Sequence, residues 1–186
     1  QGIHFVDSNT GWVVGWSGVI IKTTDGGSNW SSQTSGTTRR LTEVHFVDSN
    51  TGWAVGNNAT IIKTTDGRSN WSSQSASIDD LWDVHFIDSN TGWAAGQGGD
   101  IIKTTDGGSN WSIESSGTSK WINAIHMYDA NTGWVVGNGG LVIKYSDTTA
   151  PTVSSVGSYA SDGTYKIGDE IVIKVLFTEN LTVTGT

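Results

Sequence analysis

An eleven-residue stretch that recurs along the chain constrains the fold more than any other feature. Ile61 to Trp71 has counterparts at Ile20 to Trp30 and Ile101 to Trp111, and a worn counterpart at Val142 to Asp147. Each copy enters through branched apolar residues, passes an Asp–Gly turn, and the full copies end at a Trp. Gly accepts the positive φ of a tight reversal, and Asp can bond the amides just ahead of it. The stretch therefore predicts a β-hairpin that is built several times.

Three kinds of residue recur in register with this hairpin. Each is separated from its next copy by 41, 40 and 41 positions. The three sets are His4, His45, His85 and His126; Asp25, Asp66, Asp106 and Asp147; and Trp12, Trp53, Trp93 and Trp134. A helical repeat is excluded because the apolar residues have no 3.6-residue period. Four short strands in about 41 residues match one blade of a β-propeller.

We therefore predict an all-β fold of β-propeller blades, in four repeats of four antiparallel strands, followed by a partial Ig-like β-sandwich. The propeller repeats occupy residues 1–150, with blades at about 1–36, 37–77, 78–118 and 119–150. In the second repeat the expected strands are 42–47, 52–56, 60–64 and 70–74. The residues expected to hold the turns are Asp25, Gly26, Trp30, Asp66, Gly67, Trp71, Asp106, Gly107 and Trp111.

Two stretches carry resemblances to known families. Thr23 to Trp30 resembles the Asp-box (BNR) repeat of sialidases and related propellers. The longer unit, Val44 to Gly56 followed by Ile61 to Gly67, is more similar to the repeat of photosystem II stability/assembly-factor-like propellers. This second resemblance covers residues 1 to about 147 and implies a propeller that binds another protein.

The tail after Pro151 has a different texture, without Trp and with alternating runs at 170–177 and 181–184. Residues 162–180 are similar to bacterial Ig-like or cadherin-like modules of large surface proteins, so 151–186 is expected to be the N-terminal part of such a module. Its acids Asp162, Asp169 and Glu179 offer ligands for calcium between modules. No other cofactor is expected.

The number of repeats leaves the closure of the ring open. Residues 1–147 hold about 3.6 repeats of 41 residues (147/41), whereas the propellers that the chain resembles usually have six or more blades. Three arrangements fit: further blades before Gln1, a closed ring of four, or an open arc completed by partner chains. An open arc exposes two blade faces, which favours association.

The charge balance excludes some partners. The 186 residues include 18 acids and 10 bases, for a net charge of −8, so nucleic acids and anionic membranes lack a basic face to bind. No apolar run reaches the roughly 18 residues of a membrane span, so membrane insertion is not expected. The chain has no Cys for a disulfide or a thiolate metal site.

Residues that interrupt the repeat are better candidates for ligand binding than residues that keep it. Several lie in or beside the connections between blades, and an exposed Trp suits stacking on a ligand. The alternative is that Trp82 and Trp121 pack between blades. The candidate ligand-binding residues are Trp16, Arg39, Arg40, Arg68, Trp82 and Trp121.

Catalytic and metal-binding hypotheses fit the sequence less well. A glycosidase needs two carboxylates at a set separation, and no evident pair stands out among Glu43, Asp79, Asp80, Asp83, Asp100 and Glu114. The sialidase resemblance implies three Arg that converge on one carboxylate. The only three Arg of this chain are Arg39, Arg40 and Arg68, and the first two are adjacent in sequence. The recurring His could converge on a metal, but one hydrogen-bonded His per blade suits a scaffold better. We expect no catalytic residue and no metal site.

The preferred functional hypothesis is a non-catalytic, secreted or cell-surface module for adhesion, ligand binding or structural assembly in a larger multidomain protein. Its partner would be a protein, a glycan or a copy of itself, and its location extracellular or at the cell surface. The repeated blades and the Ig-like tail motivate this hypothesis. One alternative is an assembly or chaperone-like factor that binds a protein partner, and a second is an Asp-box glycoside hydrolase.

Overall fold

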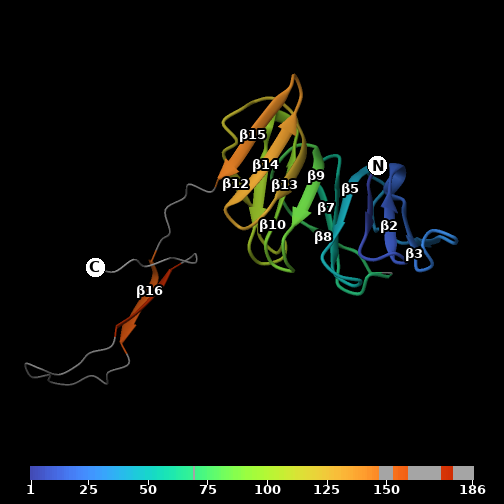
Figure 1. The fold of residues 1–186 in the computed structure, drawn as a ribbon, viewed down its shortest axis with the longest axis horizontal. Helices are drawn as coiled ribbons and strands as arrows, with labels where there is room; N and C mark the ends of the chain where they lie inside the picture. The colour runs from blue at the N-terminus through green and yellow to red at the C-terminus, as the bar shows by residue number, and fades with distance from the viewer. Residues whose placement is uncertain (69, 147–152, 159–172, 178–186) are drawn as a thin grey trace, which may run out of the picture. The chain divides into compact units, whose positions relative to one another are not determined.

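The computed structural model describes residues 1–68, 70–146, 153–158 and 173–177. The chain divides into two compact units, Gln1–Asp147 and Thr148–Thr186. The described residues of the first unit form three four-stranded sheets and one three-stranded sheet, which follow one another in chain order in Figure 1. Within this described part, no helix has the length and apolar character of a membrane span.

Each sheet of the first unit is an antiparallel meander, so neighbours in sequence are neighbours in space. Blade 1 consists of β1 (Ile3–Phe5), β2 (Gly11–Val14), β3 (Ile20–Thr23) and β4 (Ser31–Gln33). Blade 2 consists of β5 (Leu41–Phe46), β6 (Gly52–Gly56), β7 (Thr60–Thr64) and β8 (Ser72–Gln74). Blade 3 consists of β9 (Leu81–Phe86), β10 (Gly92–Gly96), β11 (Ile101–Thr104) and β12 (Ser112–Glu114). Blade 4 consists of β13 (Ile122–Met127), β14 (Thr132–Gly137) and β15 (Leu141–Ser146), and the 3-10 turns η1 (Trp16–Gly18) and η2 (Gln97–Gly99) follow β2 and β10.

Blade 4 has three strands among the described residues, where four were expected. Its worn hairpin at Asp147 lies outside those residues, as do the calcium-ligand candidates Asp162, Asp169 and Glu179 and the run at 181–184. The described part of the second unit is one antiparallel pair, β16 (Val153–Ser158) and β17 (Ile173–Phe177). The Ig-like module therefore stays a prediction.

The strand register gives every blade two distinct faces. In blade 2, His45 pairs with Trp53 and Trp53 pairs with Lys63, so these three side chains share one face, the Trp face. The opposite face, here called the Phe face, carries Phe46 and Ile62. The other blades repeat this register, with His4, His85 and His126 opposite Trp12, Trp93 and Trp134.

Neighbouring blades pack the Trp face of one on the Phe face of the next. Trp12 stacks on Phe46 with ring centroids 3.6 Å apart, and Trp53 stacks on Phe86 at 3.5 Å. At the third interface Met127 takes the place of Phe and packs in one cluster with Trp93. The three Trp are completely buried. Because a buried aromatic side chain removes about 150–250 Å² from water, these Trp dominate the packing between blades.

The blades fan out around an inner edge, as they do in a propeller. The first strands β1, β5, β9 and β13 lie against one another in succession. Among the described residues no comparable contact joins the outer strands β4, β8 and β12. The first strands are therefore the innermost strands of β-propeller blades.

The four blades form an open arc. The Phe face of blade 1 leaves Ile3 61% exposed, and the Trp face of blade 4 leaves Trp134 44% exposed. Figure 1 places these two blades at opposite ends of the first unit. A closed ring of four would bury both faces, so that alternative is wrong.

Candidate functional site

The Asp–Gly turns after β3, β7 and β11 are closed by their own side chains. Asn29 donates from its amide nitrogen and its Nδ2 to the two carboxylate oxygens of Asp25, at 2.8 and 2.7 Å. Asn110 does the same to Asp106, at 2.9 and 2.7 Å. Hydrogen bonds from the Arg68 amide and the Asn70 side chain lower the pKa of Asp66 to about 2. These carboxylates stabilise the turn by accepting hydrogen bonds from residues within it.

The same turns also connect successive blades. The Gly67 carbonyl in blade 2 accepts hydrogen bonds from Lys22 Nζ at 2.8 Å and Trp12 Nε1 at 3.4 Å in blade 1. The Gly107 carbonyl in blade 3 accepts from Trp53 Nε1 at 3.0 Å. Gly26 is the equivalent residue of blade 1, which has no preceding blade in the described chain.

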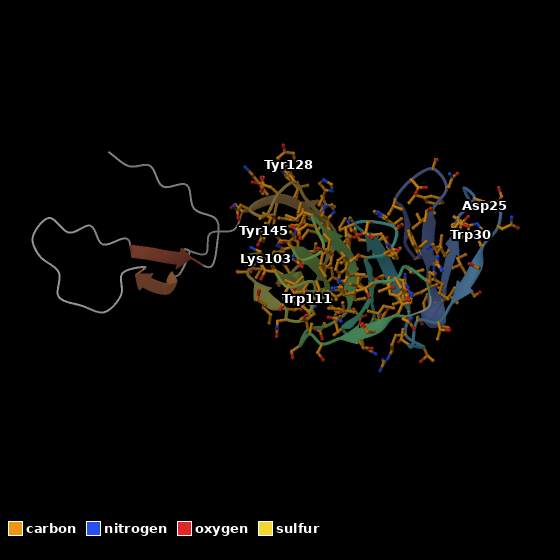
Figure 2. The ribbon with its side chains drawn as sticks, turned by 90° about the horizontal axis from the view of Figure 1, so that it is seen from below. Asp25, Trp30, Lys103, Trp111, Tyr128 and Tyr145 are labelled. Carbon is orange, nitrogen blue, oxygen red and sulfur yellow. The ribbon has the colours of Figure 1, made fainter. Side chains whose placement is uncertain are left out.

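The turn Trp residues pack edge-on against the Phe of their own blade. Trp30, Trp71 and Trp111 lie 6.1, 5.8 and 6.0 Å from Phe5, Phe46 and Phe86, at interplanar angles of 90, 87 and 88°. Trp71 is 9% exposed and donates to Gln33 Oε1 of blade 1. Trp30, labelled beside Asp25 in Figure 2, is 38% exposed because its blade is the first of the arc.

Four of the six candidate ligand-binding residues meet in a row across four successive blades. The Arg40 guanidinium lies 4.6 Å from the Trp16 ring centroid and 5.8 Å from that of Trp82. The Trp82 ring in turn stacks on Trp121, with centroids 5.9 Å apart. We call these four residues the aromatic row. It lies where the inner strands β5, β9 and β13 begin, so blade geometry brings together residues that are far apart in sequence.

The aromatic row contains buried polar atoms without partners. Among the described residues, Arg40 Nε and Trp82 Nε1 are buried and make no hydrogen bond. Nearby, Asp80 accepts hydrogen bonds from Asn57 Nδ2 and the Asn58 amide, at 2.6 and 2.7 Å. An unsatisfied buried donor costs about 1–3 kcal/mol, so these two atoms make the row a destabilising feature of the fold.

Arg39 and Arg68 are not part of the aromatic row. Arg39 is exposed on the connection between blades 1 and 2, next to Arg40 but outside the stack. Arg68 is exposed in the Asp–Gly turn of blade 2. That turn lies at the end of the blades opposite the aromatic row. The glycines of these turns hydrogen-bond to the loop that joins the first and second strands of a blade; the Gly107 amide, for example, donates to the Asn90 carbonyl.

The inner strands line a cavity of about 440 Å³ along the concave side of the arc. The rings of His4, His45, His85 and His126 follow one another along it, with centroids 4.7, 4.8 and 4.5 Å apart. The first three each hydrogen-bond to the backbone of the next blade, at Phe46, Phe86 and Met127. Among the described residues, no three His, Cys, Asp or Glu are arranged to hold a metal ion. Through these hydrogen bonds, His4, His45 and His85 connect the inner strands of adjacent blades.

Two carboxylates that sequence analysis did not pair line this cavity together. Asp83 accepts from the amides of Val84 and, on blade 4, Ile125, at 2.8 and 2.7 Å. Glu43 accepts from Val44 at 3.0 Å and from Ile3 on blade 1. Burial raises the pKa of Asp83 to about 6 and raises that of Glu43. Both acids tie inner strands of adjacent blades. The sequence contains one signal for this pair. Glu43 and Asp83 occupy the same position of the repeat, where blades 1 and 4 have Gly2 and Ala124.

The buried His row predicts a loss of stability in acid. Burial lowers the pKa of His45 from 6.5 to about 3, so the unfolded chain binds more protons between these values and folding weakens as pH falls. Asp83 acts in the opposite direction below about pH 6. Urea titrations at pH 7, 5 and 4 should therefore show that the difference in free energy of unfolding between wild type and His45→Gln becomes smaller as the pH falls. A difference that stays constant with pH would contradict this account.

These features define a β-propeller with BNR-type repeats and an aromatic row at one end of its inner strands. The sequence profile described as photosynthesis system II assembly factor YCF48 matches residues 1–72, 30–87 and 79–146. The chain belongs to this family. A comparison with curated protein sequences gives no match.

Solved structures share the same fold. YCF48 bound to a D1 peptide is 22% identical, with a TM-score of 0.62, covering 83% of this chain and 55% of that one. YCF48 from Cyanidioschyzon merolae is 22% identical, with a TM-score of 0.60, covering 84% and 59%. The GH74 enzyme of Niastella koreensis is 18% identical, with a TM-score of 0.63, covering 78% and 28%. The chain thus spans little more than half the length of the two YCF48 chains.

The family match corrects the preferred functional hypothesis. A secreted or cell-surface adhesion module is wrong, and so is the expected extracellular location, because the matching family is one of photosystem assembly factors. The hypothesis depended on the Ig-like texture of the tail, of which the structure describes one strand pair.

Proposed function

We propose that this protein is an assembly factor that binds an extended segment of a partner protein along the aromatic row. Membership of the YCF48 family and the likeness to YCF48 bound to a D1 peptide support a peptide ligand. The observation that carries the proposal is the stack of Trp16, Arg40, Trp82 and Trp121, whose two outer Trp are exposed. The match to an assembly-factor family supports a binding role without catalysis.

The chemistry of the row suits an extended peptide. Its three steps of 4.6, 5.8 and 5.9 Å cover at most about five residues of extended chain, at about 3.3 Å per residue. The faces of Trp16 and Trp121, both exposed, accept apolar side chains. Arg40 is partly exposed, and its guanidinium can donate to backbone carbonyls or to a carboxylate of the segment.

A binding titration with a fluorescent synthetic D1 peptide tests this proposal. Arg40→Gln and Trp82→Ala should each weaken binding at least about tenfold, since Trp and Arg at the centre of an interface carry most of its binding energy. The matched control is Trp30→Ala, which removes a partly exposed Trp at the opposite end of the blades and should leave the affinity unchanged.

Two results would contradict the proposal at different points. If wild type does not bind the peptide, the proposed function fails. If wild type binds and Trp30→Ala weakens binding as much as Trp82→Ala does, the aromatic row is not the binding surface.

A further inference from the structure

The turn that joins β6 to β7 in blade 2 has a strained backbone. Its central residues Asn58 and Ala59 have φ of +54° and +50°, a left-handed conformation that is unfavourable for residues with a Cβ. The equivalent turn of blade 3 contains Gly98 and Gly99, at φ of +71° and +87°, and glycine adopts this conformation freely. The turn of blade 2 therefore needs contacts from outside itself to keep its shape.

Blade 3 supplies these contacts. The two carboxylate oxygens of Asp80 accept hydrogen bonds from Asn57 Nδ2 at 2.6 Å and from the Asn58 amide at 2.7 Å. The Ala59 amide donates to the backbone carbonyl of Asp79 at 3.2 Å. Because hydrogen bonds to a charged acceptor are stronger than neutral ones, the Asp80 carboxylate is the main support of this turn.

The residue at the position of Asp80 differs between the blades. The equivalent residues of blades 2 and 4 are Arg40 and Trp121, neither of which offers a carboxylate. The turns of the preceding blades have glycine at the position of Ala59. In this chain the acid is thus found where the turn lacks that glycine.

The supported turn also contacts the backbone of Arg40. The Asn57 amide donates to the Arg40 carbonyl at 3.0 Å. Gly56 permits this approach, because a Cβ added there would collide with the same carbonyl. A path of hydrogen bonds therefore runs from Asp80 through Asn57 to the backbone of Arg40.

We infer that Asp80 is a positioning residue of the aromatic row. It holds the strained turn of blade 2, which holds the backbone of Arg40 and keeps the guanidinium beside Trp16 and Trp82. The effect of Asp80 on peptide binding rests on the proposed function, whereas its effect on the place of Arg40 does not.

Nuclear magnetic resonance of the ¹⁵N-labelled full chain tests this role without a ligand. The chain has three Arg, so its spectrum contains three Nε–H signals. Arg39 and Arg68 are exposed, whereas Arg40 Nε is buried beside two Trp rings, whose ring currents displace its signal. Arg40→Gln identifies the Arg40 signal by removing it.

Asp80→Ala should move the Arg40 signal toward the two signals of the exposed Arg, because the turn loses both of its carboxylate hydrogen bonds. The matched control is Asp79→Ala, which removes the same charge from the adjacent residue but keeps the carbonyl that Ala59 uses. This control should leave the signal in place. Asp80→Asn keeps one acceptor oxygen and should move the signal part of the way, and it replaces Asp80→Ala if that variant does not fold.

Glycine in the turn should rescue the loss. Asn58→Gly and Ala59→Gly, added to Asp80→Ala, remove the strain that the carboxylate opposes, so the Arg40 signal should return toward its wild-type position. Affinity for the fluorescent D1 peptide should follow the same order. It should fall about threefold or more in Asp80→Ala, as expected for residues coupled through hydrogen bonds. It should stay unchanged in Asp79→Ala and recover in the variant with the two glycines.

The outcomes separate this role from the proposed function. An Arg40 signal that stays in place in Asp80→Ala, or a displaced signal that the two glycines do not restore, would overturn the positioning role. Equal losses of affinity in Asp79→Ala and Asp80→Ala would also overturn it, because charge alone would then explain them. If the signals behave as expected but wild type does not bind the peptide, the positioning role stands and the proposed function fails.

Discussion

Replacing Trp53 with alanine should lower the free energy of unfolding of the propeller unit by about 3–5 kcal/mol, the usual loss for truncating a buried aromatic side chain. Trp53 is completely buried between blades 2 and 3, where it stacks on Phe86. It also donates to the Gly107 carbonyl, and Lys63 Nζ lies 5.1 Å from its ring. The variant therefore loses packing, a hydrogen bond between blades and a cation–π contact together.

The equivalent Trp on the open face provides the control. Trp134→Ala removes the same side chain at the same register position, but 44% of it is exposed in the single chain. Urea unfolding of this variant should show a loss below about 1 kcal/mol. Equal losses for the two variants would show that the contacts between blades do not carry the stability.

Gly67→Ala should cost about 2–4 kcal/mol, because the new methyl group has no room. Gly67 has φ of +59°, and a Cβ added there would collide with the backbone carbonyl of Ser49. The turn would have to shift, and its carbonyl would leave Trp12 Nε1 and Lys22 Nζ without their acceptor. A buried turn that connects two blades is thus sensitive to a single methyl group.

A second glycine separates the collision from the backbone strain. Gly117 has a similar φ of +70°, but a Cβ added there meets no atom within 4 Å. Gly117→Ala should therefore cost only the left-handed strain, about 1–2 kcal/mol. Thermal or urea unfolding of both variants measures the difference, and similar losses would mean that the contact with Ser49 relaxes freely.

The blade architecture follows from local sequence signals. In the second repeat the strands expected at 52–56 and 60–64 match β6 and β7. Alternating apolar residues and fixed turn residues specify a hairpin without long-range information, and four copies in register make the propeller evident. The expected fourth strand of blade 4 depended on a turn whose Gly and Trp are absent from the sequence.

The aromatic row could be predicted only as a set of candidates. Arg39 and Arg40 are adjacent and look equivalent in sequence. In the structure Arg39 is exposed, whereas Arg40 lies between Trp16 and Trp82. Likewise, Glu43 and Asp83 lie 40 positions apart and meet only because first strands converge on one cavity. Convergence of this kind depends on the angle between blades, which no local pattern specifies.

The equivalent packing of neighbouring blades also affects how such chains change in length over evolution. Because the Trp face of one blade packs on the equivalent face of the next at all three interfaces, a duplicated unit of about 41 residues would present matching faces to both of its neighbours. Gain or loss of a unit by unequal recombination therefore preserves every contact type while altering curvature and span. Near-identical neighbours also give a nascent chain several alternative partners for each sheet, which favours domain-swapped misfolding.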